Sequence, residues 1–383
     1  MNDADIVLLS ELFPPTVGGS GELLANVYAR TGIPTCVLTA GAGVDARWPH
    51  LRHEQVAYPR GQGAANPTAL MTLSRVGRAI RRAASPSAVV YCSRALPEGT
   101  AAWLNTRRGG HRYVVWVHGE ELPVAANSRE LTFLTRRVHR GAARIIANSH
   151  NTARLLLDLG NAPQKVNVIH PGVDATRFRP DVPGAAALRA RLNPDNGVLI
   201  ISIGRLQARK GHDLVLRALA ELPPQPIPPR YVIVGAGEED ARLRQLAQDL
   251  GVMSRVTFAG AAPTDELPAY FACADLFVMP NRVEGKDFEG FGIVFLEAAA
   301  AGVAVIAGRS GGVPEAVEEG VTGLLVGGTD VGEMRTALEQ LVRSAELRRQ
   351  FGAAGRARAL AHFTWERAAE QAARIHHEVR HGG

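Results

Sequence analysis

Short apolar runs alternate with segments of helical periodicity along the whole of this 383-residue chain. In the first half the apolar runs are Ile6–Leu9, Thr35–Leu38, Ala88–Tyr91, Tyr113–Val117, Arg144–Ala147 and Val166–Ile169. In the second half they are Val198–Ile203, Tyr231–Val234, Val256–Ala259, Leu276–Met279, Val303–Ala307 and Gly323–Leu325. The runs are continuously apolar, which is typical of parallel strands covered on both faces. Helices between such strands make βαβ units, so the sequence predicts an α/β fold of two doubly wound parallel sheets.

The chain length and one Pro/Gly-rich stretch indicate two domains. A chain of 383 residues exceeds what a single core usually serves. The stretch that begins at Phe178 separates the two sets of strands. We therefore expect a first domain over residues 1–177, a second over 178–364, and a last helix over 365–383 that can pack back on the first. Ligands of such sheets bind at the carboxyl ends of the strands, so we expect a site in a cleft where the domains face each other.

Positive charge is concentrated in the first half of the chain, within a net charge of +6. Residues 1–180 carry 21 Lys and Arg against 12 Asp and Glu, whereas residues 181–383 carry 22 against 25. Arginines that border helical apolar stripes are Arg75, Arg78, Arg81 and Arg82, and then Arg136, Arg137 and Arg140. This pattern fits either peripheral contact with an anionic membrane or core-packed helices with solvated edges. Aromatic residues do not interleave with the basic ones, so nucleic acid is not an expected partner.

The cysteines and the hydropathy pattern bear on the compartment. Cys36, Cys92 and Cys273 are scattered and show neither a disulfide framework nor metal-ligand spacing. No stretch of about 20 apolar residues is present. We therefore expect a protein of the reducing cytoplasm, with any peripheral contact at the inner face of the membrane.

Two features of the first half fit a binding site. Gly18 and Gly19 precede a helical segment and follow a Pro-Pro loop, so backbone N–H groups there can approach a phosphate, although a plain tight turn is the simpler alternative. His118 follows directly after the strand Tyr113–Val117. A histidine at this end of a parallel strand points to the ligand edge of the sheet; the alternative is a ring satisfied by backbone bonds.

Basic residues and a glycine turn follow strands of the second half. Arg205 and Lys210 come after the strand Val198–Ile203, where a guanidinium and an ammonium can together neutralise a diphosphate. A solvated basic turn is the alternative. The turn at Gly235 resembles half of a dinucleotide fingerprint and lacks its third glycine, so we interpret it as a strand-to-helix turn that can line a nucleotide. The backbone edge at Arg255 and Val256 could contact a base.

An acidic, glycine-rich loop leads from Asn281 to Glu289 and then into the apolar helical run Ile293–Ala301. The first turn of a helix offers free N–H groups to a phosphate or a sugar oxygen. Glu289 would lie at that helix end, and Glu297 would lie roughly 8 Å further along the axis. Two carboxylates at these depths can hold the two ends of an extended polar ligand.

Metal and cofactor motifs are missing from the sequence. It has no Gly-x-x-x-x-Gly-Lys-Ser/Thr motif, no His/Cys spacing for zinc, and its one Asp-x-Asp, Asp3-Ala-Asp5, precedes the first strand. We expect neither a metal nor a cofactor, so cationic side chains and helix ends must carry the charge of a bound diphosphate.

Taken together, these motifs resemble the retaining family 4 glycosyltransferases of the two-domain, Rossmann-like GT-B fold. The segments that carry the resemblance are Gly18-Gly19, His118, Ala147-Asn148-Ser149, Val168–Asp174, Gly204-Arg205, Lys210-Gly211 and the pair Glu289 and Glu297. Within that family, the Asn281–Glu289 loop and the position of His118 are most similar to bacterial GDP-mannose-dependent α-mannosyltransferases, including phosphatidylinositol mannosyltransferases.

The resemblance implies a role for each residue of the predicted site. The first domain would bind the acceptor and the second a nucleoside-diphosphate sugar, the donor. The implied donor-binding residues are Gly18, Gly19, Arg205, Lys210, Gly235, Arg255, Val256, Glu289, Gly290, Phe291, Gly292, Ile293 and Glu297. Arg205 and Lys210 would hold the diphosphate, Glu297 the ribose, and Glu289 the sugar together with backbone N–H groups of residues 290–292. His118 would lie near the reacting carbon.

The implied reaction transfers a hexose, with mannose from GDP-mannose as the best match, to a lipid, glycan or small-molecule acceptor. His118, Glu289, Arg205 and Lys210 would be the catalytic residues. Fixed cations stabilise the leaving diphosphate, whose oxygen can accept the proton of the acceptor. A covalent intermediate on Glu289 is the less favoured route, because no second carboxylate is predicted close by.

Two other functions remain open at this point. One is a UDP-sugar-dependent transferase that acts on a soluble natural product or a thiol precursor, since the motifs do not distinguish the base. The other is a non-catalytic protein that binds nucleotide sugars. The sequence does not identify the acceptor.

Overall fold

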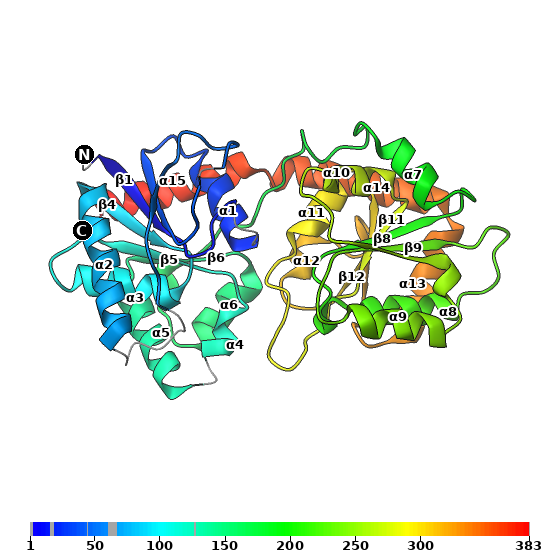
Figure 1. The fold of residues 1–383 in the computed structure, drawn as a ribbon, viewed down its shortest axis with the longest axis horizontal. Coiled ribbons are helices and arrows are strands. Elements are labelled where there is room, and N and C mark those ends of the chain that lie inside the picture. The colour runs from blue at the N-terminus through cyan, green and yellow to red at the C-terminus, as the bar shows by residue number, and fades with distance from the viewer. Residues whose placement is uncertain (1–2, 16–18, 44, 60–66, 126–127, 383) are drawn as a thin grey trace. The chain divides into compact units, whose positions relative to one another are not determined.

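The computed structural model describes residues 3–15, 19–43, 45–59, 67–125 and 128–382 of the chain (Figure 1). The chain divides into two compact units. Unit 1 contains residues 1–171 and 365–383, and unit 2 contains residues 172–364. The chain therefore first passes from unit 1 to unit 2 between Pro171 and Gly172, several residues before the boundary expected after residue 177. Gly18 lies outside the described residues.

Unit 1 is built on a seven-stranded sheet in the order β3-β2-β1-β4-β5-β6-β7, with every neighbouring pair parallel. Its strands are β1 (Ala4–Leu9), β2 (Thr35–Thr39), β3 (Arg52–Gln55), β4 (Ala84–Cys92), β5 (Tyr113–Val117), β6 (Arg144–Ala147) and β7 (Val166–Val168). The predicted strands of this half are confirmed. The edge strand β3 was not predicted, because its four residues are polar and partly exposed.

The helices of unit 1 cover both faces of this sheet. They are α1 (Gly19–Tyr28), α2 (Pro67–Ala83), α3 (Thr100–Thr106), α4 (Glu121–Ala125), α5 (Arg129–Gly141), α6 (His150–Asp158) and α15 (Trp365–His381), with a π-turn at Ala95–Gly99 (η1) and a 3₁₀ turn at Pro163–Lys165 (η2). Helix α15, red in Figure 1, packs against α1 and β4. The last helix of the chain is thus part of the first unit, although it follows the whole of unit 2 in sequence.

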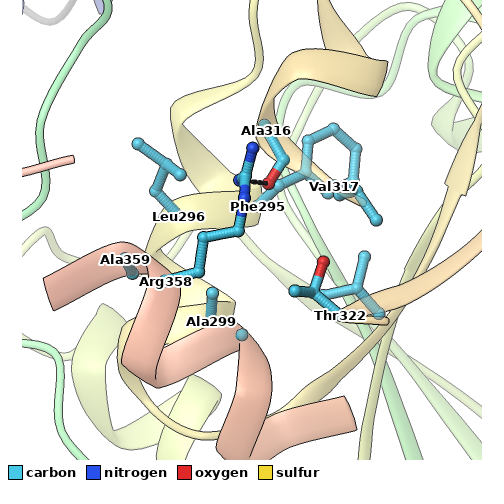
Figure 2. Close-up of a pocket in the computed structure, with 10 residues that line it drawn as sticks. Phe295, Leu296, Ala299, Ala316, Val317, Thr322, Arg358 and Ala359 are labelled. Atoms are coloured by element: carbon cyan, nitrogen blue, oxygen red, sulfur yellow. Dashed lines mark hydrogen bonds between the residues drawn. The ribbon is translucent and has the colours of Figure 1, made fainter. Parts of the chain in front are cut away.

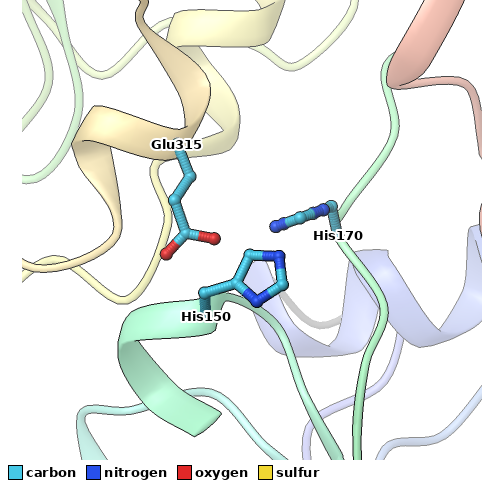
Figure 3. Close-up of side chains that lie close together, drawn as sticks. All are labelled: His150, His170 and Glu315. Atoms are coloured by element: carbon cyan, nitrogen blue, oxygen red, sulfur yellow. The ribbon is translucent and has the colours of Figure 1, made fainter. Parts of the chain in front are cut away.

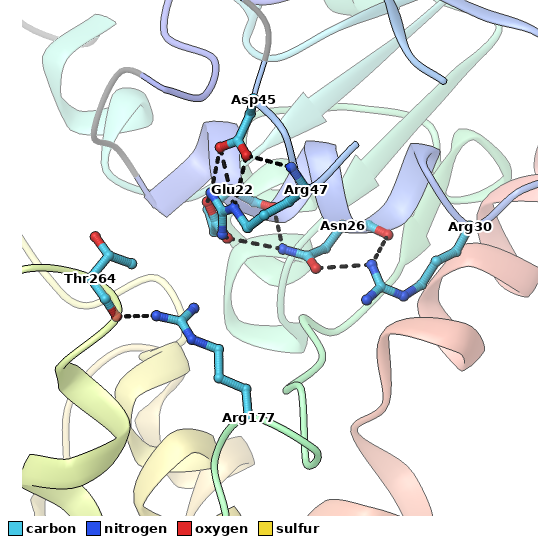
Figure 4. A network of polar contacts seen from close by, with 7 residues as sticks. All are labelled: Glu22, Asn26, Arg30, Asp45, Arg47, Arg177 and Thr264. Carbon is cyan, nitrogen blue, oxygen red and sulfur yellow. Dashed lines mark hydrogen bonds and ion pairs between the residues drawn. The ribbon is translucent and has the colours of Figure 1, made fainter. Parts of the chain in front are cut away.

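Polar contacts fix helix α1 in unit 1. Arg47 bonds both carboxylates of Glu22 and Asp45, and Arg30 donates to Asn26, as Figure 4 shows. The same figure shows a separate contact of unit 2, in which the Arg177 guanidinium donates to the carbonyl of Thr264. The contacts of Arg47 and Arg30 position α1, and the predicted glycine loop leads into the start of this helix.

Unit 2 is built on a six-stranded parallel sheet in the order β10-β9-β8-β11-β12-β13. Its strands are β8 (Leu199–Ile203), β9 (Arg230–Val234), β10 (Val256–Gly260), β11 (Leu276–Met279), β12 (Ala304–Gly308) and β13 (Gly323–Val326). All six were predicted. Strand order reverses between β8 and β11, because β9 and β10 lie on one side of this pair and β12 and β13 on the other.

Helices pack on both faces of the second sheet. They are α7 (Ala185–Leu192), α8 (His212–Ala220), α9 (Asp240–Asp249), α10 (Leu267–Cys273), α11 (Ile293–Ala300), α12 (Val313–Ala316), α13 (Val331–Arg343) and α14 (Ala345–His362), with 3₁₀ turns at Ala208–Lys210 (η3) and Met253–Arg255 (η4). Helices α8, α9 and α13 share one apolar core with the sheet, and α7, α10, α11 and α12 share the other, whereas α14 contributes to both. Burial of strand side chains on both faces is the reason for the continuous apolar runs.

One small cavity lies inside unit 2, between α11 and α14 (Figure 2). The Arg358 guanidinium lies in it and donates to the carbonyls of Ala316 and Glu315. The other lining is mostly apolar, and Ala299 and Gly355 contribute to it. The cavity lies within the packing of α11, α12 and α14 in unit 2. Among the described residues, no helix has both the length and the apolar character to cross a membrane.

Candidate functional site

Several of the predicted site residues of unit 2 lie at the carboxyl edge of its sheet, next to the point where strand order reverses. Arg205 and Lys210 follow β8, and Asn281 follows β11, the neighbouring strand. In open α/β sheets this reversal point leaves a crevice beyond the strand ends, and ligands bind there. The topology of unit 2 therefore places these side chains at the position where a ligand is expected.

Glu289 is the centre of a compact polar cluster at this edge. Its Oε2 accepts hydrogen bonds from Lys210 Nζ at 2.5 Å, Arg209 Nη1 at 2.7 Å and Asn281 Nδ2 at 2.8 Å. The side chains of Lys210, Arg209 and Glu289 are only 11 %, 10 % and 13 % exposed. Three donors on one oxygen of a largely buried carboxylate fix its position and its charge.

The electrostatics of the cluster favour the ionised form of Glu289. Burial by itself raises the pKa of this carboxyl group, but the nearby charges and hydrogen bonds of Lys210 and Arg209 outweigh it and lower the pKa to about 2. Glu289 is therefore a carboxylate at physiological pH. It is also a weak base and a weak nucleophile, because both cations stabilise its negative charge.

Backbone geometry positions the cations. Gly211, directly after Lys210, has a φ of +73°, and a Cβ there would lie 2.3 Å from the carbonyl oxygen of Pro280. Only glycine permits this close approach of the η3 turn to the end of β11. Arg282 N–H also donates to the carbonyl of Arg209 at 2.9 Å, and Arg209 Nε pairs with Asp287 at 3.0 Å. The turn after β8 and the loop after β11 are thereby joined.

The glycine turn after β12 supports the other side of Glu289. Gly311 has a φ of +57°, and a Cβ there would lie 2.0 Å from the carbonyl oxygen of Glu289. The N–H of Gly312 donates to that carbonyl at 3.0 Å. The structure therefore assigns a packing role to this turn, which holds the loop that carries Glu289.

Helix α11 begins directly after this loop, as expected. Its first residue is Ile293, its N-cap Gly292 supplies no side-chain cap, and Phe291 is buried against Phe363. Gly290 and Gly292 are the glycines of the loop between Glu289 and α11. Glu297 is partly buried on the same helix. The helix start and both carboxylates thus belong to one continuous segment.

Arg205 differs from the other two cations. Its side chain is exposed, and among the residues that the structure describes it has no hydrogen-bond or ion-pair partner. A long cation at a ligand edge without a protein partner is available to an anionic ligand.

Gly235, Arg255 and Val256 are placed differently from the Glu289 cluster. A Cβ at Gly235 would lie 1.9 Å from the carbonyl oxygen of Gly204, so a close backbone contact accounts for this glycine. Arg255 and Val256 lie at the start of β10, and Arg255 donates to the carbonyl of Leu219 at 3.2 Å. The start of a parallel strand is at the opposite edge from its carboxyl end, so the structure does not bring these two residues to the Glu289 cluster.

In unit 1, the glycines at the start of α1 have different surroundings. Gly19 is exposed, and a Cβ built on it meets no atom of the described residues within 4 Å. A Cβ on Gly21 would lie 2.4 Å from the carbonyl oxygen of Leu12. Packing within unit 1 therefore explains Gly21 and gives no reason for a glycine at position 19.

His118 lies at the carboxyl end of β5, as predicted. Its ring stacks on Trp116 with centroids 6.3 Å apart, and its Nε2 lies 2.9 Å from the carbonyl oxygen of Ser93. The backbone N–H of His118 donates to Glu121 Oε1 at 2.8 Å, and Asn148 donates to its carbonyl. Burial lowers the pKa of His118 to about 4, so the ring is neutral near pH 7. Burial also raises the pKa of Glu121 to about 7.

A pair of histidines in unit 1 lies close to the ends of β6 and β7. His150 begins α6, His170 follows β7, and their rings meet edge to face with centroids 5.2 Å apart (Figure 3). Neither histidine was predicted as a site residue.

Sequence reasoning missed several residues of the site. Arg209 and Asn281 contact Glu289 directly, and Ser93 contacts His118. Asn281 and Ser93 share one signal that could have identified them, since each follows within two residues of the end of a buried strand. Arg209 carried no comparable signal, because a basic residue in a turn is usually solvated.

Comparison with known proteins gives two matching family models. "Glycosyltransferase Family 4" matches residues 22–177, and "Glycosyl transferases group 1" matches residues 186–358. Among solved structures, the chain is similar to Anabaena Alr3699/HepE in complex with UDP and glucose, with a TM-score of 0.82 at 22 % identity over 97 % of this chain and 99 % of that one. A sucrose-phosphate synthase from Thermosynechococcus elongatus gives a TM-score of 0.80 at 23 % identity over 98 % of both chains. At these identities the likeness concerns the fold.

Closer relatives are found among characterised sequences. The chain is 34 % identical over 374 residues to the GDP-mannose-dependent alpha-(1-6)-phosphatidylinositol monomannoside mannosyltransferase of Mycolicibacterium smegmatis, covering 94 % of this chain and 95 % of the relative. It is 31 % identical to the corresponding monoacylated-substrate enzyme of Corynebacterium glutamicum, covering 92 % and 93 %. Two Rossmann-like parallel sheets with these matches define a glycosyltransferase. The chain belongs to the family 4 glycosyltransferases, which confirms the resemblance that the motifs predicted.

Proposed function

We propose that this enzyme transfers mannose from GDP-mannose to an anionic lipid of the phosphatidylinositol class, with retention of the anomeric configuration and without a metal ion. The names of the two relatives support the donor and the acceptor class. The observation that carries the proposal is the Glu289 cluster at the strand-reversal edge of unit 2, with the exposed Arg205 at the same edge. Cationic side chains there supply the charge that a diphosphate needs.

In the proposed mechanism, Arg205 and Lys210 bind the diphosphate of the donor. Breaking the bond between sugar and phosphate builds negative charge on the leaving group, and fixed cations lower that barrier. Lys210 can turn from Glu289 to the diphosphate without leaving the carboxylate unpaired, because Arg209 and Asn281 remain bonded to it. Glu297 is proposed to hold the ribose, and the backbone of residues 290–292 to hold the sugar hydroxyls.

The chemistry of Glu289 distinguishes between two routes that would both retain the anomeric configuration. A carboxylate whose pKa is lowered to about 2 by two cations is a poor nucleophile, which disfavours a covalent sugar intermediate on it. The proposed route is attack of the acceptor hydroxyl on the face that the diphosphate leaves, with a phosphate oxygen taking the proton. Proton NMR of the product linkage tests retention: an α-linked mannoside is expected, and a β-linked product would contradict it.

The donor is tested first by ligand binding. A thermal-shift series with GDP, UDP and ADP and their sugars should show the largest rise in melting temperature with GDP and GDP-mannose, because a ligand that binds only the folded state stabilises it by mass action. A larger rise with UDP-glucose would favour the UDP-sugar alternative. Binding without mannosyl transfer to any lipid extract would favour a non-catalytic protein.

Activity that survives EDTA supports metal independence, and activity restored only by a divalent ion contradicts it.

Arg205→Ala tests the diphosphate contact. Since Arg205 has no partner among the described residues, the variant should keep the melting temperature of the wild type and lose most of its affinity for GDP. Arg244→Ala is a matched control of equal charge change, because Arg244 lies in unit 2 in an exposed ion pair with Asp240. Unchanged GDP affinity in Arg205→Ala would remove this residue from the site.

Gly19→Ala tests the phosphate approach in unit 1. In the part of the chain that the structure describes, a Cβ at Gly19 meets no atom within 4 Å, so the fold should tolerate it. If a phosphate approaches the backbone here, the methyl group should lower kcat/KM by about tenfold or more, the effect of a misplaced reacting group. Gly21→Ala is the contrasting variant and should destabilise the fold, because its Cβ would lie 2.4 Å from a backbone oxygen. Wild-type kinetics in Gly19→Ala would contradict the assignment.

The basic helices of unit 1 support contact with an anionic membrane. On α2, Arg75 and Arg78 are exposed next to Met71, which is 59 % exposed. On α5, Arg137 lies over the ring of Phe133, which is 54 % exposed. Exposed apolar groups within a basic surface are typical of interfacial binding.

The membrane proposal is tested by cosedimentation with vesicles of phosphatidylcholine containing phosphatidylinositol. Arg75→Gln/Arg78→Gln should reduce binding and make it less dependent on salt. Arg343→Gln/Arg349→Gln in unit 2 removes the same charge and is the control. Equal losses in the two double variants would contradict a specific membrane surface.

A further inference from the structure

Three loops of unit 1 are joined by a buried hydrogen-bond network that the proposed function does not use. Glu98 is fully buried in the π-turn η1, and Ser93, directly after β4, is 1 % exposed. Glu98 Oε1 accepts a hydrogen bond from Ser93 Oγ at 2.8 Å and another from the backbone N–H of Glu11 at 3.0 Å. Glu11 belongs to the loop that leads from β1 to the glycines of α1. One carboxyl oxygen therefore joins the ends of β1 and β4.

The network continues to the ring of His118. The backbone N–H of Ser93 donates to the carbonyl of Leu9 at 2.8 Å, and its Oγ donates to Glu98, so the Ser93 peptide is held from two sides. Its carbonyl oxygen lies 2.9 Å from His118 Nε2. A carbonyl can only accept a hydrogen bond, so His118 Nε2 must carry the proton.

This contact determines what His118 can offer to a ligand. The neutral imidazole has one N–H, and here that N–H is at Nε2. Nδ1 therefore presents a lone pair and can only accept a hydrogen bond. Among the described residues no group donates to Nδ1, and His118 is only partly buried. The ring is suited to a hydroxyl group that donates to it, rather than to a phosphate oxygen.

Glu98 is an unusual residue for packing alone. Its second oxygen, Oε2, is buried without a hydrogen-bond partner, and the nearest cation contact is Arg94 Nε at 3.7 Å from Oε1. Burying a carboxyl group with an unpaired oxygen costs stability that an apolar residue of similar size does not. Burial also raises the pKa of Glu98, in agreement with the weak pairing. A stability cost at the ligand edge of the sheet points to a role in the site.

We propose that Glu98 is a positioning residue which, through Ser93, fixes His118 as the Nε2–H tautomer, so that Nδ1 accepts a hydrogen bond from a hydroxyl of the bound sugar. The proposal rests on the proposed function in that His118 contacts the sugar. The groups around the ring agree with it: Trp116 stacks on one face, Glu121 bonds only the backbone N–H, and the charge of Arg94 disfavours a second proton.

The test compares Glu98→Leu with Glu98→Gln. Leucine has a similar volume and removes both acceptor contacts, whereas glutamine retains an oxygen that can accept from Ser93 and Glu11. The tautomer is read from the ¹⁵N shifts of the His118 ring in histidine-labelled protein, with His118→Ala used for assignment. We expect the wild type and Glu98→Gln to show one Nε2–H form, and Glu98→Leu to show a mixture of both tautomers.

Kinetics provide the second measurement. By analogy with other groups that orient a functional histidine, Glu98→Leu should lower kcat by about 10–100-fold. The KM for the nucleotide sugar should change by less than about threefold, because the diphosphate contacts are in unit 2. Glu98→Gln should remain within about threefold of the wild type. Ser93→Ala, which loses the Oγ contact and keeps the carbonyl, should change both readouts in the same direction and serves if Glu98→Leu does not fold.

Each outcome separates the proposal from simpler explanations. A single Nε2–H form in Glu98→Leu, or wild-type kcat in that variant, would overturn it. Glu121→Gln is the control, because Glu121 is the other buried carboxyl group near His118. This variant should leave the tautomer of His118 unchanged. A tautomer change in Glu121→Gln equal to that in Glu98→Leu would also overturn the proposal. If His118→Ala keeps full activity while Glu98→Leu still alters the tautomer, then the proposed contact of His118 with the sugar fails and the positioning of the ring stands.

Discussion

Replacing Arg209 by glutamine should raise the pKa of Glu289. Two cations contact the same carboxylate oxygen, with Lys210 Nζ at 2.5 Å and Arg209 Nη1 at 2.7 Å. Together they lower the pKa of Glu289 from its ordinary value of 4.5 to about 2, although burial acts in the opposite direction. One opposite charge at this range lowers a carboxyl pKa by about 1–3 units, so loss of Arg209 should raise the pKa of Glu289 by about that amount.

The same change has a stability consequence that can be worked out with its sign. One pKa unit corresponds to about 1.4 kcal/mol, so Arg209→Gln should be less stable than the wild type at pH 7 by about 1.4–4 kcal/mol. The folded pKa of Glu289 lies below the unfolded one, so its stabilisation is present above pH 4.5 and is lost as the pH falls toward 2. The variant has less of this stabilisation to lose. The difference in unfolding free energy between the two proteins should therefore narrow as the pH falls below 4.5.

The pKa is measured directly by ¹³C NMR of glutamate-labelled protein, with Glu289→Gln for assignment. In the wild type the Glu289 carboxyl carbon should keep its ionised shift from pH 7 to pH 4, whereas in Arg209→Gln it should titrate within about 1–3 units above the wild-type midpoint. Urea unfolding of unit 2 is best followed by circular dichroism, because all four tryptophans of the chain, Trp48, Trp103, Trp116 and Trp365, lie in unit 1.

Arg244→Gln is the control for charge removal in unit 2, since its exposed pair with Asp240 should contribute less than about 1 kcal/mol. An Arg209→Gln protein whose instability is the same at every pH would refute the reasoning. That result would mean that Arg209 stabilises the loop by packing, or through Asp287, and not through the charge of Glu289.

Two further predictions concern stability alone. His376 on α15 is fully buried beside Tyr91, and neither of its ring nitrogens has a hydrogen-bond partner. Burial lowers the pKa of His376 to about 4. Its neutral form therefore stabilises the fold above pH 6.5, and this contribution is lost as the pH falls toward 4. His376→Phe should raise stability at pH 7 by about 1–3 kcal/mol and reduce the acid loss, as measured by unfolding between pH 4 and pH 7; equal acid sensitivity would contradict this. On α14, Gly355→Ala should stabilise by about 1 kcal/mol, because its Cβ meets ordinary contacts at 3.5 Å or more, whereas Gly352→Ala should destabilise, because its Cβ would lie 2.1 Å from the carbonyl oxygen of Gly302. If both variants shifted the melting temperature in the same direction, the prediction of opposite effects on the stability of α14 would be wrong.

Most strands of both sheets could be predicted because they are apolar and buried on both faces, and a buried parallel strand leaves a continuous apolar pattern in the sequence. The exception, β3, is an edge strand whose residues Arg52–Gln55 are polar, so its pairing with β2 depends on backbone bonds that no side-chain pattern reports. Strand ends could be predicted for the same reason, and with them the positions of His118 and Arg205.

The partners within the site could not be predicted. Arg209 and Glu289 are 80 residues apart in sequence, and only the packing of the η3 turn on the end of β11 brings them together. The tautomer of His118 depends on a backbone carbonyl, that of Ser93, which has no signature in the sequence. Residue type indicated which side chains could bind a ligand, whereas their pairing depended on contacts between segments that are distant in the chain.

The return of α15 to unit 1 has a consequence for biosynthesis. The ribosome delivers residues 172–364 before it delivers Trp365–His381, so unit 2 can be complete while unit 1 still lacks a helix. Until that helix emerges, the apolar surface formed by α1 and β4 stays uncovered in the nascent chain. A deletion that stops at residue 364 should therefore aggregate through unit 1, even though the part removed follows the last residue of unit 2.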